Sequence, residues 1–461
     1  MEGQVSVNVA GLRDRNLSSM LRAISIATFL ELFSITAFAA ALSPIATALH
    51  ASFASVRLLT IGYSVAVTIM LPVSGWVADA LGARRTFMTA AALFCLGCLI
   101  SYLSASMAGL VFGRVVQGLG CAFLVPVGRI SLSRAYSGDT LLRILGAIAV
   151  PAVVGSTFGP LLGGLVVDTL GWRALFLVML FAGAVCLVVA WNGYHDESSR
   201  VRKPFDFLSY FALSIAITSG LALLSQIRGT SLSSMQTNLL VALFVVAGGV
   251  FTIRVLRGRQ YLLDFSLFSL VSFRAAAGAG NFSRLGISGV PLLFAYGLQN
   301  GLAFSAVAVG ALLSLQALGA LSCKRFAVSI IQNVGYGRTL TLNTVVLGAS
   351  IVLLGFAFES RAITWIVPGV LLYGMTSSLQ FSCLNTLVFR DLSKESKSAG
   401  ASLSGTLMQL AVSLGIAIAF AMAAVFQTGS DALSMVPAVS LTLKVLGLVV
   451  LTSALNFRRL R

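Results

Sequence analysis

Six ionisable side chains lie inside long apolar runs of the sequence, and their types could support chemistry. One is the acid Glu31, and the bases are Arg114, Arg129, Arg274, Arg284 and Lys444. A charge at lipid depth is costly, so such side chains face a bundle interior or a wet cavity and mark ion or substrate paths. A helical rise of about 1.5 Å per residue puts Glu31 about 13 Å beyond Arg22, where ionisation without a partner costs several kcal/mol. These residues predict proton transfer and ligand binding within a membrane.

Arg114 is the predicted counterpart of Glu31. In the run G-R-V-V-Q-G-L-G, Arg114, Gln117 and Gly118 are spaced i, i+3 and i+4, so the guanidinium and the amide share one helix face. The glycine allows close approach of a neighbouring helix. Two interpretations of Glu31 stay open: it exchanges a coupling proton opposite Arg114, or it is a structural partner of that arginine.

Further polar side chains fall at inner positions of the apolar runs and could line a substrate cavity. They could orient a bound molecule by hydrogen bonding, and each could equally join two helices. The predicted cavity residues are Gln117, Asn281, Arg284, Gln380, Asn385, Gln409 and Lys444. Lys444 has a second interpretation, because a lysine can extend along the lipid to reach the interface.

The segment G-W-V-A-D-A-L-G-A-R-R-T-F-M, residues 75 to 88, joins two spans at the predicted cytoplasmic face. Gly75 and Asp79 end one helix, and Arg84 and Arg85 begin the next. Asp79 is expected to neutralise one of these arginines and to latch the two helices as a cytoplasmic gate. The simpler alternative is a positively charged hairpin that turns at Gly82.

A glycine string, V-G-S-T-F-G-P-L-L-G-G, occupies the fifth apolar run. Gly155, Gly159 and Gly163 recur every four residues, with Pro160 and Gly164 beside them. This spacing predicts a ridge of small residues with a kink, against which other helices pack closely. Ordinary packing of membrane helices is the alternative to a dedicated role in transport.

The composition places the chain in a bilayer. Hydrophobic residues make up 58% of its 461 residues and charged residues 10%, too few for the polar surface of a water-soluble protein. The net charge of +17 resides in short breaks between apolar runs, a topology signal that excludes a nucleic-acid partner. Six cysteines lie in or beside apolar runs, and the C-x-x-C of Cys95 and Cys98 is interpreted as helix packing. Metal ligation is not expected.

Apolar runs long enough to span a bilayer occur fourteen times, in a pattern of six, two and six. The sequence therefore predicts an all-α integral membrane protein. The predicted division is a cytoplasmic segment 1–21, a six-helix bundle 22–191, a cytoplasmic linker 192–205, two additional helices 206–256, a second cytoplasmic linker 257–271, a six-helix bundle 272–457 and a cytoplasmic tail 458–461.

Loop charges and a weak internal repeat support this division. With both termini inside, the cytoplasmic loops hold 22 Lys or Arg and the opposite loops four, as the positive-inside rule requires. Gly335 and Arg338 in the second half echo Gly82 and Arg85 in the first. The two histidines, His50 and His195, fall in loops on opposite faces and cannot share a catalytic site.

The chain resembles the major facilitator superfamily, specifically its fourteen-span drug/proton antiporter branch of the EmrB/QacA and MdtD type. Four motifs carry the resemblance in the correct order over nearly the whole chain: the loop at Gly75 to Arg84, the L-V-F-G-R-V-V-Q-G-L-G run, the glycine string and D-T-L-G-W-R-A-L-F. The resemblance implies two six-helix bundles around a central cavity, two extra central helices, alternating access and drug efflux driven by inward proton movement.

Two positions depart from the family pattern. Ser34 occupies the place of an aspartate that is usual in the first span, so it joins the predicted cavity residues, and Glu31 is the candidate to replace that aspartate. Ala83 stands where a basic residue is common.

The expected function is proton-coupled export of small organic molecules across a bacterial inner membrane. An alternative is dedicated export of an anionic metabolite, such as an organic acid or a carboxylate siderophore, because buried cations exceed buried acids. A membrane enzyme is a remote alternative, since no catalytic constellation is present, and so is a channel, which would not require the glycine string. A primary pump is not expected, because the chain lacks the G-x-x-x-x-G-K-[S/T] nucleotide loop. The expected partners are a small-molecule substrate, protons and the lipid bilayer, with no cofactor beyond the proton gradient and a monomer as the working unit.

Overall fold

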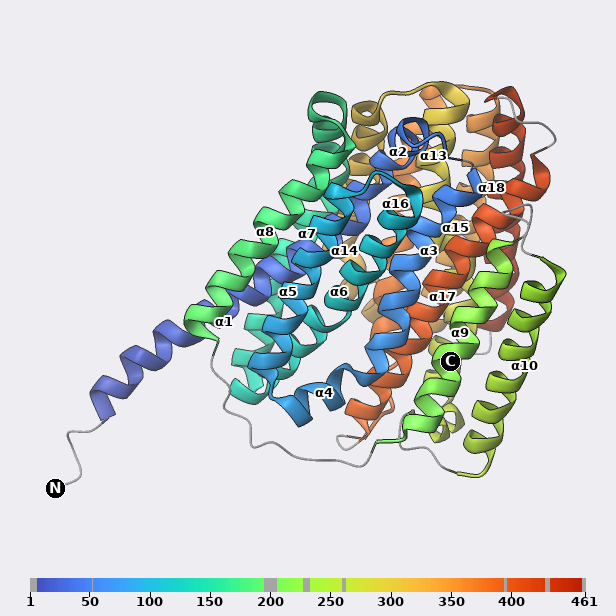
Figure 1. The fold of residues 1–461 in the computed structure, drawn as a ribbon. Coiled ribbons are helices and arrows are strands. Elements are labelled where there is room, and N and C mark those ends of the chain that lie inside the picture. The colour runs from blue at the N-terminus through green and yellow to red at the C-terminus, as the bar shows by residue number, and fades with distance from the viewer. Residues whose placement is uncertain are drawn as a thin grey trace.

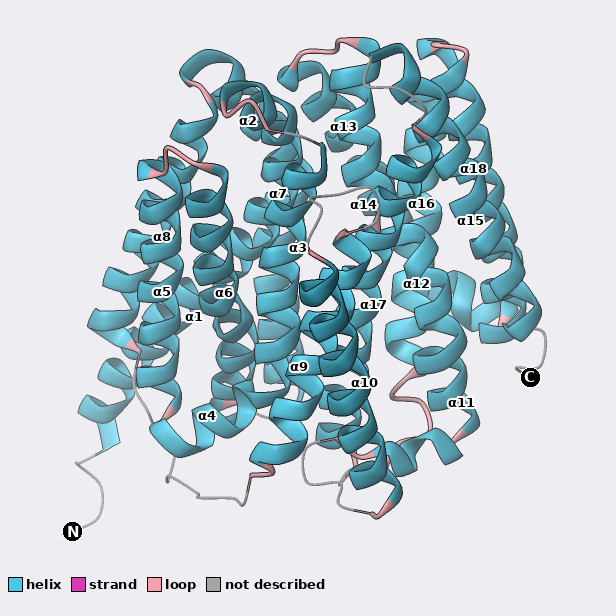
Figure 2. Ribbon diagram, turned by 45° about the vertical axis from the view of Figure 1, so that its right-hand side comes forward, coloured by secondary structure: helices cyan, strands magenta, loops and turns pink. Residues whose placement is uncertain are grey.

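The computed structural model describes residues 6–51, 53–136, 138–194, 205–226, 233–258, 263–393, 396–427 and 432–457. Nearly all of these residues are helical, and no strand occurs among them. Figure 2 shows long helices joined by short loops. Most of the predicted linker 192–205, part of the linker 257–271, His195 and the tail 458–461 lie outside the described residues. An all-α membrane architecture is confirmed.

The first six spans match the predicted runs closely. Two of them are interrupted by short 3₁₀ segments, one at Ala37–Ala41 and one at Leu71–Val73, where Pro72 removes a backbone donor. In chain order the elements are α1 (Ser6–Thr36), η1 (Ala37–Ala41), α2 (Leu42–Ala48), α3 (Phe53–Met70), η2 (Leu71–Val73), α4 (Ser74–Leu81), α5 (Ala83–Leu103), α6 (Met107–Ala135), α7 (Gly138–Leu170) and α8 (Trp172–Gly193).

The two additional helices are α9 (Phe207–Ser225) and α10 (Ser234–Leu256). Each begins at a side-chain cap: Asp206 accepts from the backbone of Ser209, and Ser233 forms a capping box with Gln236. In Figure 1 they lie side by side, in green, at the lower right, and α9 contacts α3 and α17. Apart from Ala247, every described residue of α10 is at least partly exposed, so this helix presents most of its surface to lipid.

The second half contains the remaining helices. They are η3 (Phe265–Ser269), α11 (Val271–Arg274), η4 (Ala275–Ala279), α12 (Gly280–Ser288), α13 (Val290–Leu302), α14 (Ala306–Val334), α15 (Tyr336–Glu359), α16 (Ile363–Leu387), α17 (Lys397–Phe426) and α18 (Ala432–Phe457). The segment that begins the predicted bundle 272–457 is divided among α11, a π-helical turn η4, α12 and α13. The break before α13 coincides with Gly289 and Pro291, which weaken a continuous helix.

Twelve helices among the described residues are long and apolar enough to cross a membrane. The 25-residue α16 and the divided segment from α11 to α13 occupy the other two predicted positions. This arrangement is consistent with fourteen spans.

The predicted repeat has a structural counterpart in two glycine turns. Gly82 precedes α5 and Gly335 precedes α15, with φ of 91° and 83°. Glycine adopts this backbone conformation without steric strain, whereas other residues do not. The two halves thus use the same turn at corresponding positions.

Hydrogen bonds between the two halves concentrate at one end of the molecule, which we call the outer end and which is uppermost in Figure 1. There α2 lies beside α13, and α7 beside α14. Near mid-length the Thr68 hydroxyl of α3 lies 2.8 Å from that of Ser413 on α17.

Candidate functional site

Glu31 projects from the last third of α1 and is half-buried. Within the described chain no ion pair joins its carboxylate to Arg114; the cation whose charge acts on it is Arg129, an exposed residue of α6. Arg129 was recognised in the sequence only as a cation within an apolar run. An acid and a base at lipid depth, near one another and only partly covered, require water or a cavity around them.

Arg114 lies deeper, inside the first bundle, with 1% of its surface exposed. Its Nη1 donates to Oε1 of Gln117 at 2.5 Å, as the i, i+3 spacing predicted. Its guanidinium carbon lies 4.0 Å from the ring centre of Phe38 and 4.4 Å from that of Tyr63, so two aromatic faces compensate part of the buried charge. Arg114 therefore lies in the bundle interior between Gln117 and two aromatic rings.

Gln117 and Ser34 do not line an open space in this conformation, because both are fully buried. The amide of Gln117 donates to Sγ of Cys98 at 3.2 Å and so joins α6 to α5. The Ser34 hydroxyl donates to the backbone oxygen of Glu31 at 3.0 Å. Both side chains join helices or backbone, the alternative that the sequence left open for polar residues.

In the second half, Arg284, Asn281 and Asn385 come together. Arg284 of α12 donates from Nη1 to Oδ1 of Asn281 at 2.7 Å and from Nη2 to Oδ1 of Asn385 at 2.9 Å. Arg284 is 2% exposed, whereas Asn385 on α16 is exposed. The cluster thus extends from the bundle interior to its surface.

Two other predicted cavity residues have different surroundings. Gln380 is fully buried, where its amide donates to Oγ1 of Thr344 at 2.9 Å and its oxygen accepts from Asn343 at 2.9 Å, so it joins α16 to α15. Gln409 is half-buried on α17.

The placement of Lys444 in the cavity is wrong. Its ammonium pairs with the carboxylate of Glu359, the last residue of α15, and lies 4.0 Å from the ring centre of Phe356. The long side chain extends toward the helix end, where a carboxylate and water are available, in keeping with the alternative interpretation. Lys444 therefore ties α18 to α15.

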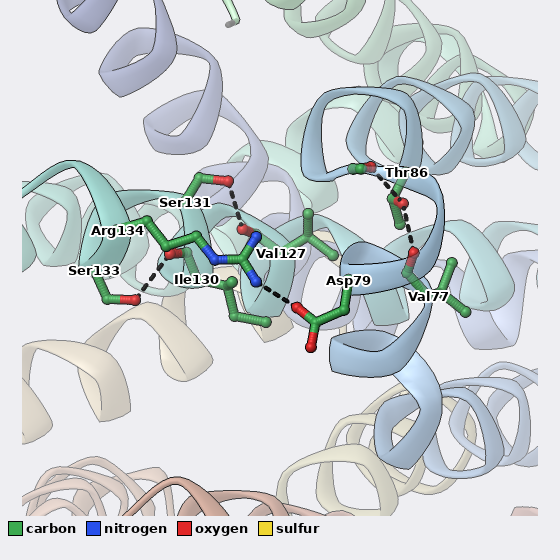
Figure 3. Close-up of polar contacts among 9 residues, drawn as sticks. Val77, Asp79, Thr86, Val127, Ile130, Ser131, Ser133 and Arg134 are labelled. Atoms are coloured by element: carbon green, nitrogen blue, oxygen red, sulfur yellow. Dashed lines mark hydrogen bonds and ion pairs between the residues drawn. The ribbon is translucent and has the colours of Figure 1, made fainter. Parts of the chain in front are cut away.

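The partner expected for Asp79 is also wrong. Its carboxylate pairs with Arg134, near the end of α6, and not with Arg84 or Arg85 (Figure 3). Arg84 instead donates to the backbone oxygen of Trp191 on α8 at 2.9 Å. Arg84 thus contacts α8, and the ion pair of Asp79 joins α4 to α6.

The rest of this loop has simpler roles. Arg85 is exposed, and Gly75 has room beside it, with Ile130 as its nearest neighbour. Gly82 forms the turn, which a hydrogen bond from Oγ1 of Thr86 to its backbone oxygen reinforces at 2.9 Å.

The glycine string of α7 packs on two helices. A Cβ at Gly155 would meet the Phe29 backbone at 2.7 Å, and one at Gly163 would meet Ala37 at 2.7 Å, so this ridge fits against α1 and η1. A side chain at Gly159 would collide with Thr36. These glycines permit backbone contacts that no larger residue allows.

The end of the same string contacts the second half. A side chain at Gly164 would collide with the backbone of Ala306. Likewise, a side chain at Gly310 of α14 would collide with the backbone of Pro160. One helix face therefore serves packing within a bundle, and the adjacent face serves contact between bundles.

Three outer contacts between the halves were not predicted as site features. The Asp168 carboxylate accepts from the backbone nitrogens of Ala306 at 3.3 Å and Val307 at 2.9 Å. The Gln299 amide donates to the Ala40 backbone oxygen at 2.8 Å. The hydroxyl of Ser43 donates to Oδ1 of Asn300 at 3.1 Å. Only Asp168 had a sequence signal, as the first residue of D-T-L-G-W-R-A-L-F.

Comparison with known proteins agrees with this architecture. Residues 24–416 match the family model of the Major Facilitator Superfamily. The chain is 32% identical over 409 residues to the MdtD protein of Cronobacter sakazakii, described as a candidate multidrug resistance protein, covering 88% of this chain and 86% of that protein. An Escherichia coli MdtD protein is 32% identical over 85% of this chain and 83% of its own length.

Solved transporter structures share the fold at low sequence identity. The POT family transporter PepTSo superposes with a TM-score of 0.72 at 14% identity, covering 95% of this chain and 96% of that one. The human organic anion transporter MFSD10 gives a TM-score of 0.63 at 16% identity, with coverages of 95% and 99%. From its family match and its relatives, the chain belongs to the major facilitator superfamily and is a multi-pass membrane transporter similar to MdtD proteins.

Proposed function

We propose that this transporter exports small organic molecules in exchange for protons, by alternating access between two helix bundles. The observation that carries the proposal is Glu31, an acid at lipid depth that lies near Arg129 without an ion pair joining it to Arg114. Such a carboxylate can bind a proton when its side of the protein opens to one compartment and release it when the access changes. The multidrug resistance attributed to the MdtD relatives supports export as the direction.

Alternating access is supported by where the halves touch. Their hydrogen bonds at Asp168, Gln299 and Ser43 hold the outer end together, while Glu31, Arg129 and Asn385 lie away from those contacts with part of their surface uncovered. These contacts and exposures support a transporter that is closed at one end and accessible from the other. Breaking the outer contacts while forming others at the opposite end would change the side of the membrane to which the interior of the transporter opens.

The membrane and the orientation follow from the same proposal. The relatives are bacterial, which supports the inner membrane, and the excess of Lys and Arg in one set of loops supports cytoplasmic termini. The outer end then faces away from the cytoplasm. One chain contains both bundles, which supports a monomer as the working unit.

The test replaces Glu31→Gln, which keeps the shape of the side chain and removes its titration. In proteoliposomes with an imposed pH gradient, we expect proton-driven efflux of a dye to disappear. Dye exchange that is driven by a dye gradient alone should persist. Asp391→Asn is the matched control, because Asp391 is 45% exposed beside Arg390 on the surface. Undiminished proton-driven efflux by the Glu31 variant would refute the proposal.

A further inference from the structure

Among the described residues, the charge of Arg284 has no acidic partner. The residue is 2% exposed, and its Nη1 and Nη2 donate hydrogen bonds to the neutral amides of Asn281 and Asn385. Its Nε has no hydrogen-bond partner in the described part of the chain. Among the described residues no carboxylate lies within 4 Å of the guanidinium, whereas Arg134, Arg254 and Lys444 all have acidic partners.

An unpaired buried cation is energetically expensive. Burying an isolated charge costs several kcal/mol even after relaxation, and amide oxygens supply only partial compensation. Arg114 is also buried without an acid, but two aromatic rings lie within 4.4 Å of its guanidinium carbon. For Arg284 the nearest ring is Phe381, at 5.3 Å from the guanidinium carbon. The buried charge of Arg284 therefore has an unfavourable free energy that a bound anion would reduce.

The site also has an approach from the surface. Asn385 is exposed and Phe381 is half-buried, and both lie on α16 next to the guanidinium. Nη2 points at Oδ1 of Asn385, so rotation of that amide would free a donor for an arriving ligand. On α12 the arginine follows the π-helical turn η4, an irregularity that often occurs at functional sites.

We propose that Arg284, with Asn281 and Asn385, binds an anionic group of the cargo, most simply a carboxylate. A guanidinium presents two parallel N–H donors that match the two oxygens of a carboxylate, and the amide nitrogen of Asn385 can donate to the same group. The face of Phe381 offers an apolar surface to an aromatic or aliphatic cargo body. The inference rests on the proposed function only in taking the ligand to be the exported molecule.

The test measures binding without a proton gradient, so that its outcome is independent of the coupling mechanism. Purified full-length protein in nanodiscs is titrated with fluorescein, an anionic xanthene dye, and with rhodamine 6G, a cationic dye on the same scaffold. Fluorescence anisotropy gives the two affinities. We expect Arg284→Gln to weaken fluorescein binding at least about tenfold and to leave rhodamine 6G binding unchanged. Arg284→Lys should restore part of the affinity, because it keeps the charge but not the paired donors.

A control separates binding from folding. Arg274→Gln removes an exposed arginine from the same divided span and should leave both affinities unchanged. Fluorescein should raise the thermal unfolding temperature of the wild type and of Arg274→Gln but not of Arg284→Gln. Equal fluorescein affinity in the wild type and Arg284→Gln would overturn the inference, as would equal loss of both dyes in Arg284→Gln. Undiminished proton-driven efflux in Glu31→Gln would refute the proposed coupling alone and would leave this binding result intact.

Discussion

The contact between Asp168 and the first turn of α14 predicts how strongly the outer end is held closed. The first N–H groups of a helix have no partner within it. In α14 the Ser305 hydroxyl accepts from the nitrogen of Ala308, and the Asp168 carboxylate of the other half accepts from Ala306 and Val307. Opening the outer end would return these two groups to water.

The magnitude follows from capping energies. Removing a capping side chain costs about 0.5–2 kcal/mol, and because Asp168 is exposed we take the lower half of that range, about 0.5–1 kcal/mol. Asp168→Ala should therefore shift the equilibrium toward the outward-open state by about two- to fivefold. Asp168→Asn should have a smaller effect, since it loses the charge but keeps an acceptor oxygen.

Spin labels at Leu170 and Trp365 would measure this shift. These residues are 71% and 69% exposed and lie at the outer ends of the two halves, so their separation increases when that end opens. Pulsed electron paramagnetic resonance should show a larger long-distance population in Asp168→Ala and an unchanged one in Asp391→Ala, a surface control. An unchanged distribution in Asp168→Ala, or an equal shift in both variants, would refute the reasoning.

Three further predictions concern other contacts. Exchanging Asp79 for asparagine and Arg134 for glutamine, singly and together, should give a coupling energy of about 0.2–1 kcal/mol in a double-mutant cycle of thermal stability, because the pair is partly exposed. Gly163→Val should abolish folded expression, whereas Gly248→Val, in open space on α10, should leave it unchanged. Burial raises the pKa of Asp206, but hydrogen bonds from Ser209 and Arg254 outweigh this effect and lower the pKa overall. The difference in stability between the wild type and Asp206→Asn should therefore be present near pH 7 and shrink below about pH 4.

Each of these predictions has a result that contradicts it. Strict additivity of the Asp79 and Arg134 substitutions would show that their contact contributes nothing. Normal expression of Gly163→Val would mean that α7 is not pressed against η1. For Asp206→Asn, thermal unfolding could show a stability difference that persists unchanged to pH 3. That result would exclude titration of the Asp206 carboxylate as the source of the difference, because a group with a lowered folded-state pKa loses its contribution to stability as it becomes protonated.

The sequence by itself determined the membrane spans and the local contacts. Apolar runs and breaks fix span boundaries because every backbone group in lipid must be satisfied within a helix. The helices α5 (Ala83–Leu103) and α18 (Ala432–Phe457) accordingly begin and end within a few residues of the predicted runs. The i, i+3 spacing placed Arg114 and Gln117 on one helix face, where the structure shows a hydrogen bond between them. The sequence also offered a turn at Gly82 as an alternative, and that glycine has a positive φ.

Only the tertiary structure decided which distant charges meet. Arg134 and Asp79 are 55 residues apart, Lys444 and Glu359 are 85 apart, and Asp168 and Ala306 are 138 apart. The sequence suggested nearer partners for Asp79 and a cavity position for Lys444. Those expectations failed because pairing across helices depends on how each helix is rotated about its axis and how far it slides along its neighbour. Packing of whole helix faces sets both quantities, and the spacing of residues along one chain segment does not contain them.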